Sequence, residues 1–147
     1  MQDNLENIVN HRVSIVAVLM KRQIFKILSK KELKVTPDQW VVLYYLWQHN
    51  GLSIGEIAKQ SKKDFANVTR IVDKLIKMEY LTKKRDKNDS RKSNVFLQPK
   101  GNAIKEDIQN CWKEASDIAL KGISKIEQEQ LMNILTKIEN NILIDLE

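Results

Sequence analysis

The sequence has few of the residues that make tight turns, disulfide bonds or metal sites. Four glycines and two prolines in 147 residues leave little room for a turn-rich all-β architecture, so a mostly helical chain is favoured. The single cysteine, Cys111, excludes an internal disulfide bond, and two histidines cannot complete a standard structural zinc site with it. No run approaches the ~18 apolar residues of a membrane span, and the acidic N-terminus is unlike a signal peptide. We therefore expect a cytoplasmic protein without a metal or a membrane partner.

Catalytic patterns are also missing. His11 and His49 stand alone, and the sequence contains no phosphate-cradling glycine-rich loop, nucleophile elbow or metal-spaced cluster. We therefore expect no enzyme activity and no cofactor. The overall composition, with 42% hydrophobic and 30% charged residues, is ordinary for one folded domain of this length.

Positive charge is concentrated in one segment. Residues 60–100 contain 12 lysines and arginines against 5 acidic residues, whereas the rest of the chain has 13 basic and 14 acidic residues. The excess positive charge of the chain therefore lies in this segment. Such a concentration is typical of nucleic-acid binding, although charge alone does not distinguish it from a lysine-rich solvated surface.

Four helix starts can be placed from their caps. The pattern Ser/Thr-x-x-Glu/Gln predicts capping boxes at Thr36–Gln39, Ser53–Glu56 and Ser124–Glu127. Pro37 suits the first position of a helix that we expect to stop at Asn50-Gly51. The short helix after Ser53 is expected to end near Gln60, and Asp64 can cap the next helix.

The helix after Asp64 is strongly amphipathic. One face is apolar at helical spacing, with Val68, Ile71, Val72 and Leu75. The opposite face carries residues that can enter a major groove: Ala66, Asn67, Thr69, Arg70 and Lys74. Asparagine can read adenine, and arginine can read guanine, through paired hydrogen bonds. For Phe65, at the first helical position, we favour packing on the preceding helix over contact with thymine methyl groups.

A cationic β-hairpin is expected after Leu81. Val95 and Leu97 lie two apart, as on the inner face of a strand. The basic residues around the tip are Lys83, Lys84, Arg85, Lys87, Arg91 and Lys92, of which Lys84, Arg91 and Lys92 are our candidates for contact with DNA. Asp89 can hold the stem of Arg91 in one orientation, and an arginine at a thin tip suits a narrow minor groove. The alternative is an ordinary solvated hairpin that contributes nothing to binding.

Long apolar stripes mark both ends of the chain. A helix over Leu5–Leu33 would be roughly 40 Å long, too long for one small core to cover. A further helix is expected from Pro99 to Gly122, with Cys111 buried and unreactive. The last helix carries the stripe Leu131, Leu135, Ile138, Ile142 and Leu146. Exposed stripes of this kind need a partner, most simply a second copy in a two-fold dimer.

Two further groups of residues have competing interpretations. The helix after Pro37 holds Trp40, Tyr44 and Trp47, which we expect in the core rather than around a cofactor. His11 lies beside the apolar stripe of the first helix. We expect it to be a hydrogen-bonded helix histidine rather than part of a ligand cleft.

Three segments together match the pattern of one family. They are VTPDQWVVL (35–43), NVTRIVDKL (67–75), and Asp89-Ser90-Arg91 followed by VFLQPKG (95–101). Over nearly the whole chain the sequence resembles the multiple-antibiotic-resistance regulators (MarR), a family of winged-helix repressors and activators. The resemblance implies a mainly α fold with a winged helix-turn-helix lobe over residues 36–98, including a small β-hairpin wing. It also implies a helical dimerisation region formed by residues 1–33 and 101–147.

The resemblance implies residue roles as well. Asn67 and Arg70 fall where the family contacts bases, with Ala66 and Thr69 beside them. Arg91 falls on the arginine that enters the minor groove, and Asp89 on the acid that orients it. Effectors of the family sit between the dimer helices and the DNA-binding lobe, which here would draw on His11, Trp40, Tyr44 and Trp112.

The sequence departs from the family in three places. Glu79 stands where a glycine usually ends the recognition helix, so this turn is expected to lack a left-handed residue or to be reshaped. Gln98 replaces the usual threonine cap before Pro99. The early cysteine of the peroxide-sensing branch is absent, which argues against that chemistry.

The sequence thus predicts a homodimeric, sequence-specific transcriptional regulator that binds a pseudo-palindromic double-stranded DNA operator. A ligand-responsive repressor with a small-molecule effector is favoured, although the sequence specifies neither the effector nor the sign of regulation. The alternative is a winged-helix protein-interaction module without DNA specificity. RNA binding is disfavoured because the aromatic stacking platform of RNA-binding domains is missing.

Overall fold

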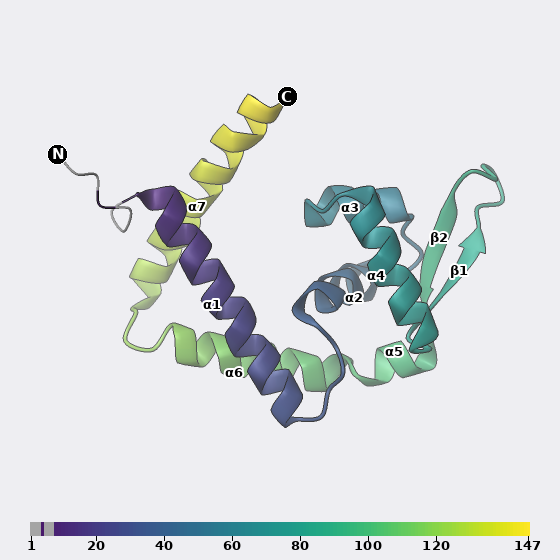
Figure 1. Cartoon of the computed structure of the whole chain (residues 1–147), viewed down its shortest axis with the longest axis horizontal. Helices are drawn as coiled ribbons and strands as arrows, with labels where there is room; N and C mark the ends of the chain where they lie inside the picture. Colours follow the sequence, from purple (N-terminus) through teal and green to yellow (C-terminus); the bar gives the residue numbers. More distant parts are fainter. Residues whose placement is uncertain (1–3, 5–7) are drawn as a thin grey trace. The chain divides into compact units, whose positions relative to one another are not determined.

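The computed structural model describes residue 4 and residues 8–147 (Figure 1). The elements are α1 (Val9–Lys30), α2 (Pro37–Gln48), α3 (Ile54–Ser61), α4 (Phe65–Lys77), β1 (Leu81–Arg85), β2 (Ser93–Leu97), α5 (Pro99–Ala103), α6 (Lys105–Ala119) and α7 (Lys125–Leu146). The two strands pair in an antiparallel hairpin. The predicted fold class, mainly α with a small β-hairpin, is confirmed. The chain divides into two compact units, Met1–Ala115 and Ser116–Glu147.

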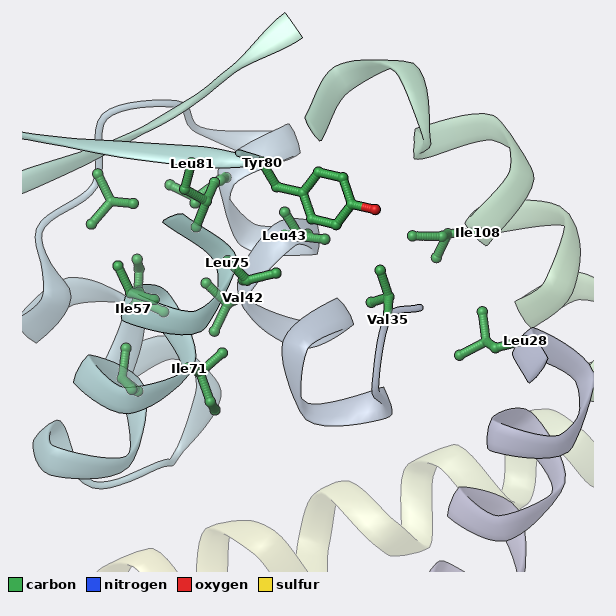
Figure 2. Packing of buried hydrophobic residues seen from close by; sticks show 14 of the residues in the cluster. Leu28, Val35, Val42, Leu43, Ile57, Ile71, Leu75, Tyr80, Leu81 and Ile108 are labelled. Atoms are coloured by element: carbon green, nitrogen blue, oxygen red, sulfur yellow. The ribbon is translucent and has the colours of Figure 1, made fainter. Parts of the chain in front are cut away.

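One hydrophobic core holds the first unit together (Figure 2). It combines buried side chains from α1, α2, α3, α4, α6, the hairpin and the segment between α1 and α2: Leu28, Val35, Val42, Leu43, Ile57, Ile71, Leu75, Leu81, Val95 and Ile108. Because interiors are close-packed, the helices and strands that share this core hold their outer faces in a fixed relation to one another.

The predicted helix starts are confirmed. Thr36 and Gln39, Ser53 and Glu56, and Ser124 and Glu127 form reciprocal capping boxes at α2, α3 and α7. At α3 the backbone N–H of Ser53 donates to the Glu56 carboxylate at 2.7 Å, and this hydrogen bond lowers the pKa of Glu56. Each box satisfies backbone N–H groups that have no partner inside the helix.

The first helix is shorter than the predicted span Leu5–Leu33. Leu5 lies outside the described residues, and α1 ends at Lys30. Beyond it Glu32 adopts a left-handed backbone (φ 57°), and the N–H of Leu33 reaches back to the carbonyl of Leu28 at 3.0 Å. This reversal closes the helix before Leu33.

The single helix predicted from Pro99 to Gly122 is wrong, because two helices, α5 and α6, meet at Ile104. The indole N–H of Trp47 donates to the carbonyl of Gly101 at 3.1 Å. In a continuous helix the N–H of Lys105 would use that carbonyl. A tertiary hydrogen bond therefore accompanies the break. Cys111 of α6 is fully buried, as predicted.

The aromatic residues of α2 divide between core and surface. Trp40 and Trp47 are half-buried and pack against the core, as expected. Tyr44 is 38% exposed, so its assignment to the core was wrong. The buried residues of α2 are Gln39, Val42, Leu43 and Leu46, and Tyr44 is not among them.

The second unit contains the last turn of α6 and the whole of α7. Gly122 has a left-handed backbone (φ 78°) in the turn between them. No residue of α7 is buried, and the predicted apolar stripe, from Leu131 to Leu146, is exposed or half-buried. Among the described residues no helix is both long and apolar enough to cross a membrane.

Candidate nucleic-acid interface

Helices α3 and α4 form a helix-turn-helix. Lys62, which follows α3, has a left-handed backbone (φ 58°) that turns the chain. Asp64 then caps α4, since its Oδ1 accepts the N–H of Asn67 at 2.7 Å. The predicted cap is confirmed, and so is the buried face of Val68, Ile71, Val72 and Leu75. The opposite face of α4 is therefore turned outward.

The predicted reading residues lie together on α4. Ala66, Arg70 and Lys74 are exposed, and Asn67 and Thr69 are half-buried. The hydroxyl of Thr69 donates to the carbonyl of Phe65 at 2.8 Å, so its proton is engaged within the helix. The position of these residues suits insertion into a major groove, and their contact with bases stays a prediction.

The predicted packing of Phe65 on the preceding helix is wrong. Its side chain is 60% exposed at the first position of α4. The apolar residues of α3, Ile54, Ile57 and Ala58, are already buried in the core. They leave little apolar surface on which the phenyl ring of Phe65 could pack.

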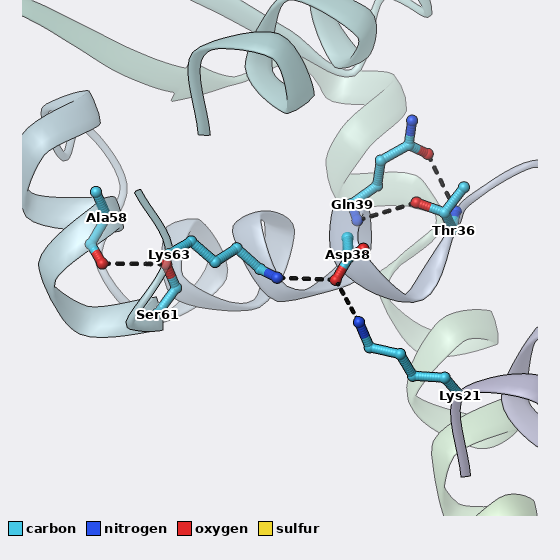
Figure 3. A network of polar contacts seen from close by, with 7 residues as sticks. All are labelled: Lys21, Thr36, Asp38, Gln39, Ala58, Ser61 and Lys63. Atoms are coloured by element: carbon cyan, nitrogen blue, oxygen red, sulfur yellow. Dashed lines mark hydrogen bonds and ion pairs between the residues drawn. The ribbon is translucent and has the colours of Figure 1, made fainter. Parts of the chain in front are cut away.

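Asp38, in the first turn of α2, links the turn before α4 to helix α1 (Figure 3). Its Oδ1 accepts hydrogen bonds from Lys63 Nζ at 2.8 Å and from Lys21 Nζ at 3.1 Å. Lys63 lies in the turn before α4, and Lys21 lies on α1. The hydrogen bond from Lys63 is the main cause of the lowered pKa of Asp38, to which Lys21 adds against the opposing effect of partial burial. Our sequence analysis missed this contact because its members are distant along the chain.

Strands β1 and β2 form the wing, which extends from the helices in Figure 1. The strands pair in register from Leu81↔Leu97 to Arg85↔Ser93. The N–H of Val95 donates to the carbonyl of Leu52 at 2.8 Å, which joins β2 to the segment after α2. On the other strand, Lys83 Nζ lies 2.7 Å from Asp73 Oδ1 of α4. The base of the wing is thus anchored on both sides.

The tip of the wing is organised by a residue that sequence analysis missed. Asp86 Oδ1 accepts the backbone N–H groups of Asn88 at 2.7 Å and of Asp89 at 3.2 Å. Its Oδ2 accepts from Asn94 Nδ2 at 3.2 Å. These hydrogen bonds, that of Asn88 first, lower the pKa of Asp86. An aspartate two residues before Asn88 is a turn signal, and this signal could have identified Asp86 from the sequence.

The predicted wing residues are all placed on this loop or its strands. Lys84, Arg91 and Lys92 are exposed, and Lys84 Nζ lies 5.3 Å from the ring centroid of Phe96. Asp89 Oδ1 accepts the backbone N–H of Arg91 at 3.0 Å. The carboxylate therefore contacts the backbone of Arg91, whereas the sequence predicted a contact with the side-chain stem of this arginine. Its orienting role for Arg91 stays a prediction.

Comparison with known proteins agrees with this geometry. The MarR family profile matches residues 35–93. The HTH-type transcriptional regulator TtmR of Methylorubrum extorquens is 32% identical over 109 residues, a match that covers 74% of this chain and 55% of TtmR. This chain has a MarR-family domain at residues 35–93. Its named relatives are helix-turn-helix transcriptional regulators, and the match spans only about half the length of TtmR.

Solved MarR-type structures share the fold. The PcaV regulator of Streptomyces coelicolor, solved in complex with its natural ligand, is 18% identical with a TM-score of 0.87, covering 95% of this chain and 97% of PcaV. The MepR–DNA complex of S. aureus is 23% identical with a TM-score of 0.83, covering 91% of this chain and 98% of MepR. At these identities the likeness shows the winged-helix fold.

The turn after the recognition helix has a left-handed residue although it contains no glycine. Glu79 has φ 64°, in the left-handed region. Our expectation that this turn lacks a left-handed residue or is reshaped was wrong. The N–H of the next residue, Tyr80, reaches the carbonyl of Leu75 at 3.0 Å and closes the helix. A side chain in this conformation costs roughly 1–2 kcal/mol. At the other departure, Gln98 makes no side-chain cap hydrogen bond at α5.

The candidate effector residues are only partly brought together. Trp40 and Trp112 stack with ring centroids 3.9 Å apart, and Tyr44 lies 5.4 Å from Trp40. Both indole Nε1 atoms are buried without a hydrogen-bond partner in the described part of the chain. His11 instead lines a shallow hollow formed by residues of α1, among them Ile15 and Leu19.

No group of three or more histidine, cysteine, aspartate or glutamate side chains that could hold a metal ion occurs among the described residues. Cys111 is unpaired and buried, and its burial raises the pKa of the thiol. A buried thiol with a raised pKa is a weak nucleophile.

Proposed function

We propose that this MarR-family protein is a homodimeric regulator of transcription that binds a pseudo-palindromic site on double-stranded DNA. In this proposal α4 of each copy enters one major groove, and the two half-sites lie about 10 bp apart. Each wing lies along the adjacent minor groove, where Arg91 meets the narrow, negatively charged floor.

The exposed face of α4 is the observation that carries the proposal. Arg70 and Lys74 are exposed on a helix whose opposite face is buried, and the wing beside it exposes Lys84, Arg91 and Lys92. Residues 60–100 hold the excess positive charge of the chain. A helix presented in this way, flanked by cations, suits both base reading and phosphate contact. The fold shared with MepR, which was solved with DNA, supports the same use of the lobe.

The homodimer is supported by apolar surface at both ends of the chain. Val9, Val13 and Val16 of α1 are exposed. On α7 the candidate dimerisation residues are Leu131, Leu135, Ile138, Ile142 and Leu146, none of them buried. Soluble monomers rarely expose apolar surface on this scale, and a second copy would cover it. Sedimentation at micromolar concentration should show a dimer, and a monomer would contradict this part of the proposal.

A ligand-responsive repressor is the form of regulation that we propose. Trp40, Tyr44 and Trp112 form an aromatic cluster with two buried indole N–H donors that find no acceptor among the described residues. A small aromatic ligand with an acceptor group would satisfy a donor that is otherwise costly to bury. PcaV, of the same fold, was solved with a ligand. The position of His11 gives no support for a part in this cluster.

The first test is the salt dependence of binding to duplex DNA. Cationic wings should make log K fall steeply with log salt, by roughly 0.9 for each phosphate neutralised. A gel-shift titration over a range of KCl concentrations measures the slope. A flat dependence, or no retention on DNA beads in the presence of heparin, would favour a protein-interaction module instead.

The second test separates base reading from phosphate contact. Arg70→Ala should cost about 1–3 kcal/mol on a selected operator and relax its preference over random DNA. Lys84→Ala should weaken binding to both DNAs by similar factors because phosphates are the same in every sequence. Equal losses on the two DNAs for both variants would refute the assigned roles.

A further inference from the structure

The start of the recognition helix carries an exposed apolar edge that DNA reading by Asn67 and Arg70 does not use. Phe65 is 60% exposed, whereas the other large apolar residues of α4 are buried or half-buried. Ala66 beside it is exposed as well. An isolated exposed phenyl group is common on protein surfaces. Phe65 is distinguished by its position at the start of the recognition helix.

Thr69 belongs to the same edge. It lies one helical turn after Phe65, and residues four apart on a helix are surface neighbours. Because its hydroxyl donates to the carbonyl of Phe65 at 2.8 Å, this proton is not available to a base acceptor. In this rotamer Thr69 offers a methyl group and an oxygen that can only accept. The three residues therefore present mainly apolar groups.

We propose that this apolar edge, formed by Phe65, Ala66 and Thr69, reads thymine through its 5-methyl group in the major groove. The inference rests on the proposed function, since it assigns base specificity to the same helix. Phenyl, alanine and threonine methyl groups are the side-chain groups that pack on the thymine methyl. The surrounding surface is cationic, with Arg70 and Lys74 exposed on the same helix, which suits a DNA groove better than an apolar protein partner.

The edge and the polar residues divide the reading between them. Asn67 and Arg70 can specify purines by hydrogen bonds, while Phe65 recognises a base that such bonds define less well. Each half-site should accordingly contain at least one thymine at the position facing the first turn of α4. If Phe65 contacts this thymine, removing only the 5-methyl group of the base should lower the affinity of the protein for the duplex.

The experiment begins with duplexes selected from a random-sequence library by the purified full-length protein. Each thymine of the selected half-site is then replaced singly by deoxyuridine, which lacks only the 5-methyl group. Fluorescence anisotropy gives the affinity of wild type and of Phe65→Ala for every duplex. At one or two positions deoxyuridine should weaken the wild type about four-fold, the effect of leaving one methyl group unburied. Phe65→Ala should bind thymine and deoxyuridine duplexes equally.

Two variants control for general effects on folding and binding. Phe25→Ala removes a phenyl group of similar exposure, 53%, from α1 and should keep the wild-type sensitivity to deoxyuridine. Phe65→Leu keeps an apolar side chain and should retain part of it. Wild-type indifference to deoxyuridine at every position overturns the proposal, and so does sensitivity that persists in Phe65→Ala. If the wild type enriches no duplex at all, the proposed function fails together with this inference, whereas enrichment without methyl sensitivity overturns the inference alone.

Discussion

Lys63 Nζ and Asp38 Oδ1 lie 2.8 Å apart, and this contact joins the turn before the recognition helix to the first turn of α2. The side chain of Lys63 is only 18% exposed, whereas that of Lys21, the second partner of the same oxygen, is 62% exposed. Lys63 is therefore the stronger of the two links. The N-terminus of α2 also favours a negative charge at Asp38. The carboxylate thus helps to hold α4 in its orientation.

Removing the charge of Asp38 should make stability less dependent on pH. Asp38→Asn is expected to cost less than about 1 kcal/mol near pH 7, because the carboxylate is partly exposed and screened. The pKa of Asp38 in the folded protein is lowered from the ordinary value of 3.8. The ionised group therefore stabilises the fold above that value, and its contribution is lost as the pH falls through the lower folded-state pKa.

Urea unfolding of the wild type and Asp38→Asn between neutral and acid pH checks this expectation. The difference in the free energy of unfolding should be constant near neutrality and should close below about pH 4. Lys63→Ala should reproduce the neutral-pH loss more fully than Lys21→Ala. A difference that stays unchanged in acid would show that the charge of Asp38 does not stabilise the fold.

Loss of the Asp86 carboxylate should loosen the wing tip. Asp86→Ala removes the acceptor of three hydrogen bonds and should reduce affinity for a selected operator roughly five-fold, about 1 kcal/mol. Asp86→Asn keeps an Oδ1 for both backbone N–H groups, so its affinity for the operator should lie between those of the wild type and Asp86→Ala. Hydrogen exchange over residues 86–92 should quicken in the alanine variant even without DNA. Unaltered exchange and unaltered affinity would contradict this role.

Glycine at position 79 should stabilise the protein. Glu79→Gly relieves the strain of the left-handed backbone but raises the conformational entropy of the unfolded chain. The free energy of unfolding is therefore expected to rise by about 0.5–1 kcal/mol. Glu79→Ala is the matched control, since it removes the carboxylate and its 3.8 Å contact with Lys100 without relieving the backbone. It should change stability by less than about 0.5 kcal/mol. Chemical denaturation measures both, and a glycine variant no more stable than the alanine variant would argue against strain.

A side chain at position 101 should be poorly tolerated. A Cβ on Gly101 would lie 2.3 Å from the carbonyl oxygen of Tyr80. Gly101→Ala must therefore displace α5 from the end of the hairpin, at a cost of roughly 1–3 kcal/mol. Gly55→Ala is the control, because its Cβ would meet nothing closer than 3.9 Å and alanine favours a helix. The thermal midpoint should fall for the first variant alone, and similar midpoints for the two would contradict the close approach.

Helix starts and apolar faces were predictable because their signals are local. Thr36, Ser53, Asp64 and Ser124 each meet a backbone N–H within three residues, so the caps follow from spacing. The buried face of α4 follows from its periodicity in the same way. The placement of Asn67 and Arg70 on the outward side needed only this period and the MarR resemblance.

The features that were mispredicted do not follow from local signals in the sequence. Trp47 bonds the carbonyl of Gly101, 54 residues away, at the break between α5 and α6. Phe65 is exposed because the apolar surface of α3 is already used by the core. Glu79 keeps a left-handed backbone that no local propensity of glutamate favours.

The amino-acid sequence by itself determined the helix-turn-helix, the wing and the position of the positive charge, since caps, periodicity and charge act over a few residues. Only the tertiary structure decided that Asp38 joins Lys21 and Lys63, and that Phe65 faces solvent. These outcomes depend on which surfaces meet when the core closes, and that competition between distant groups for the same space leaves no pattern in the order of residues.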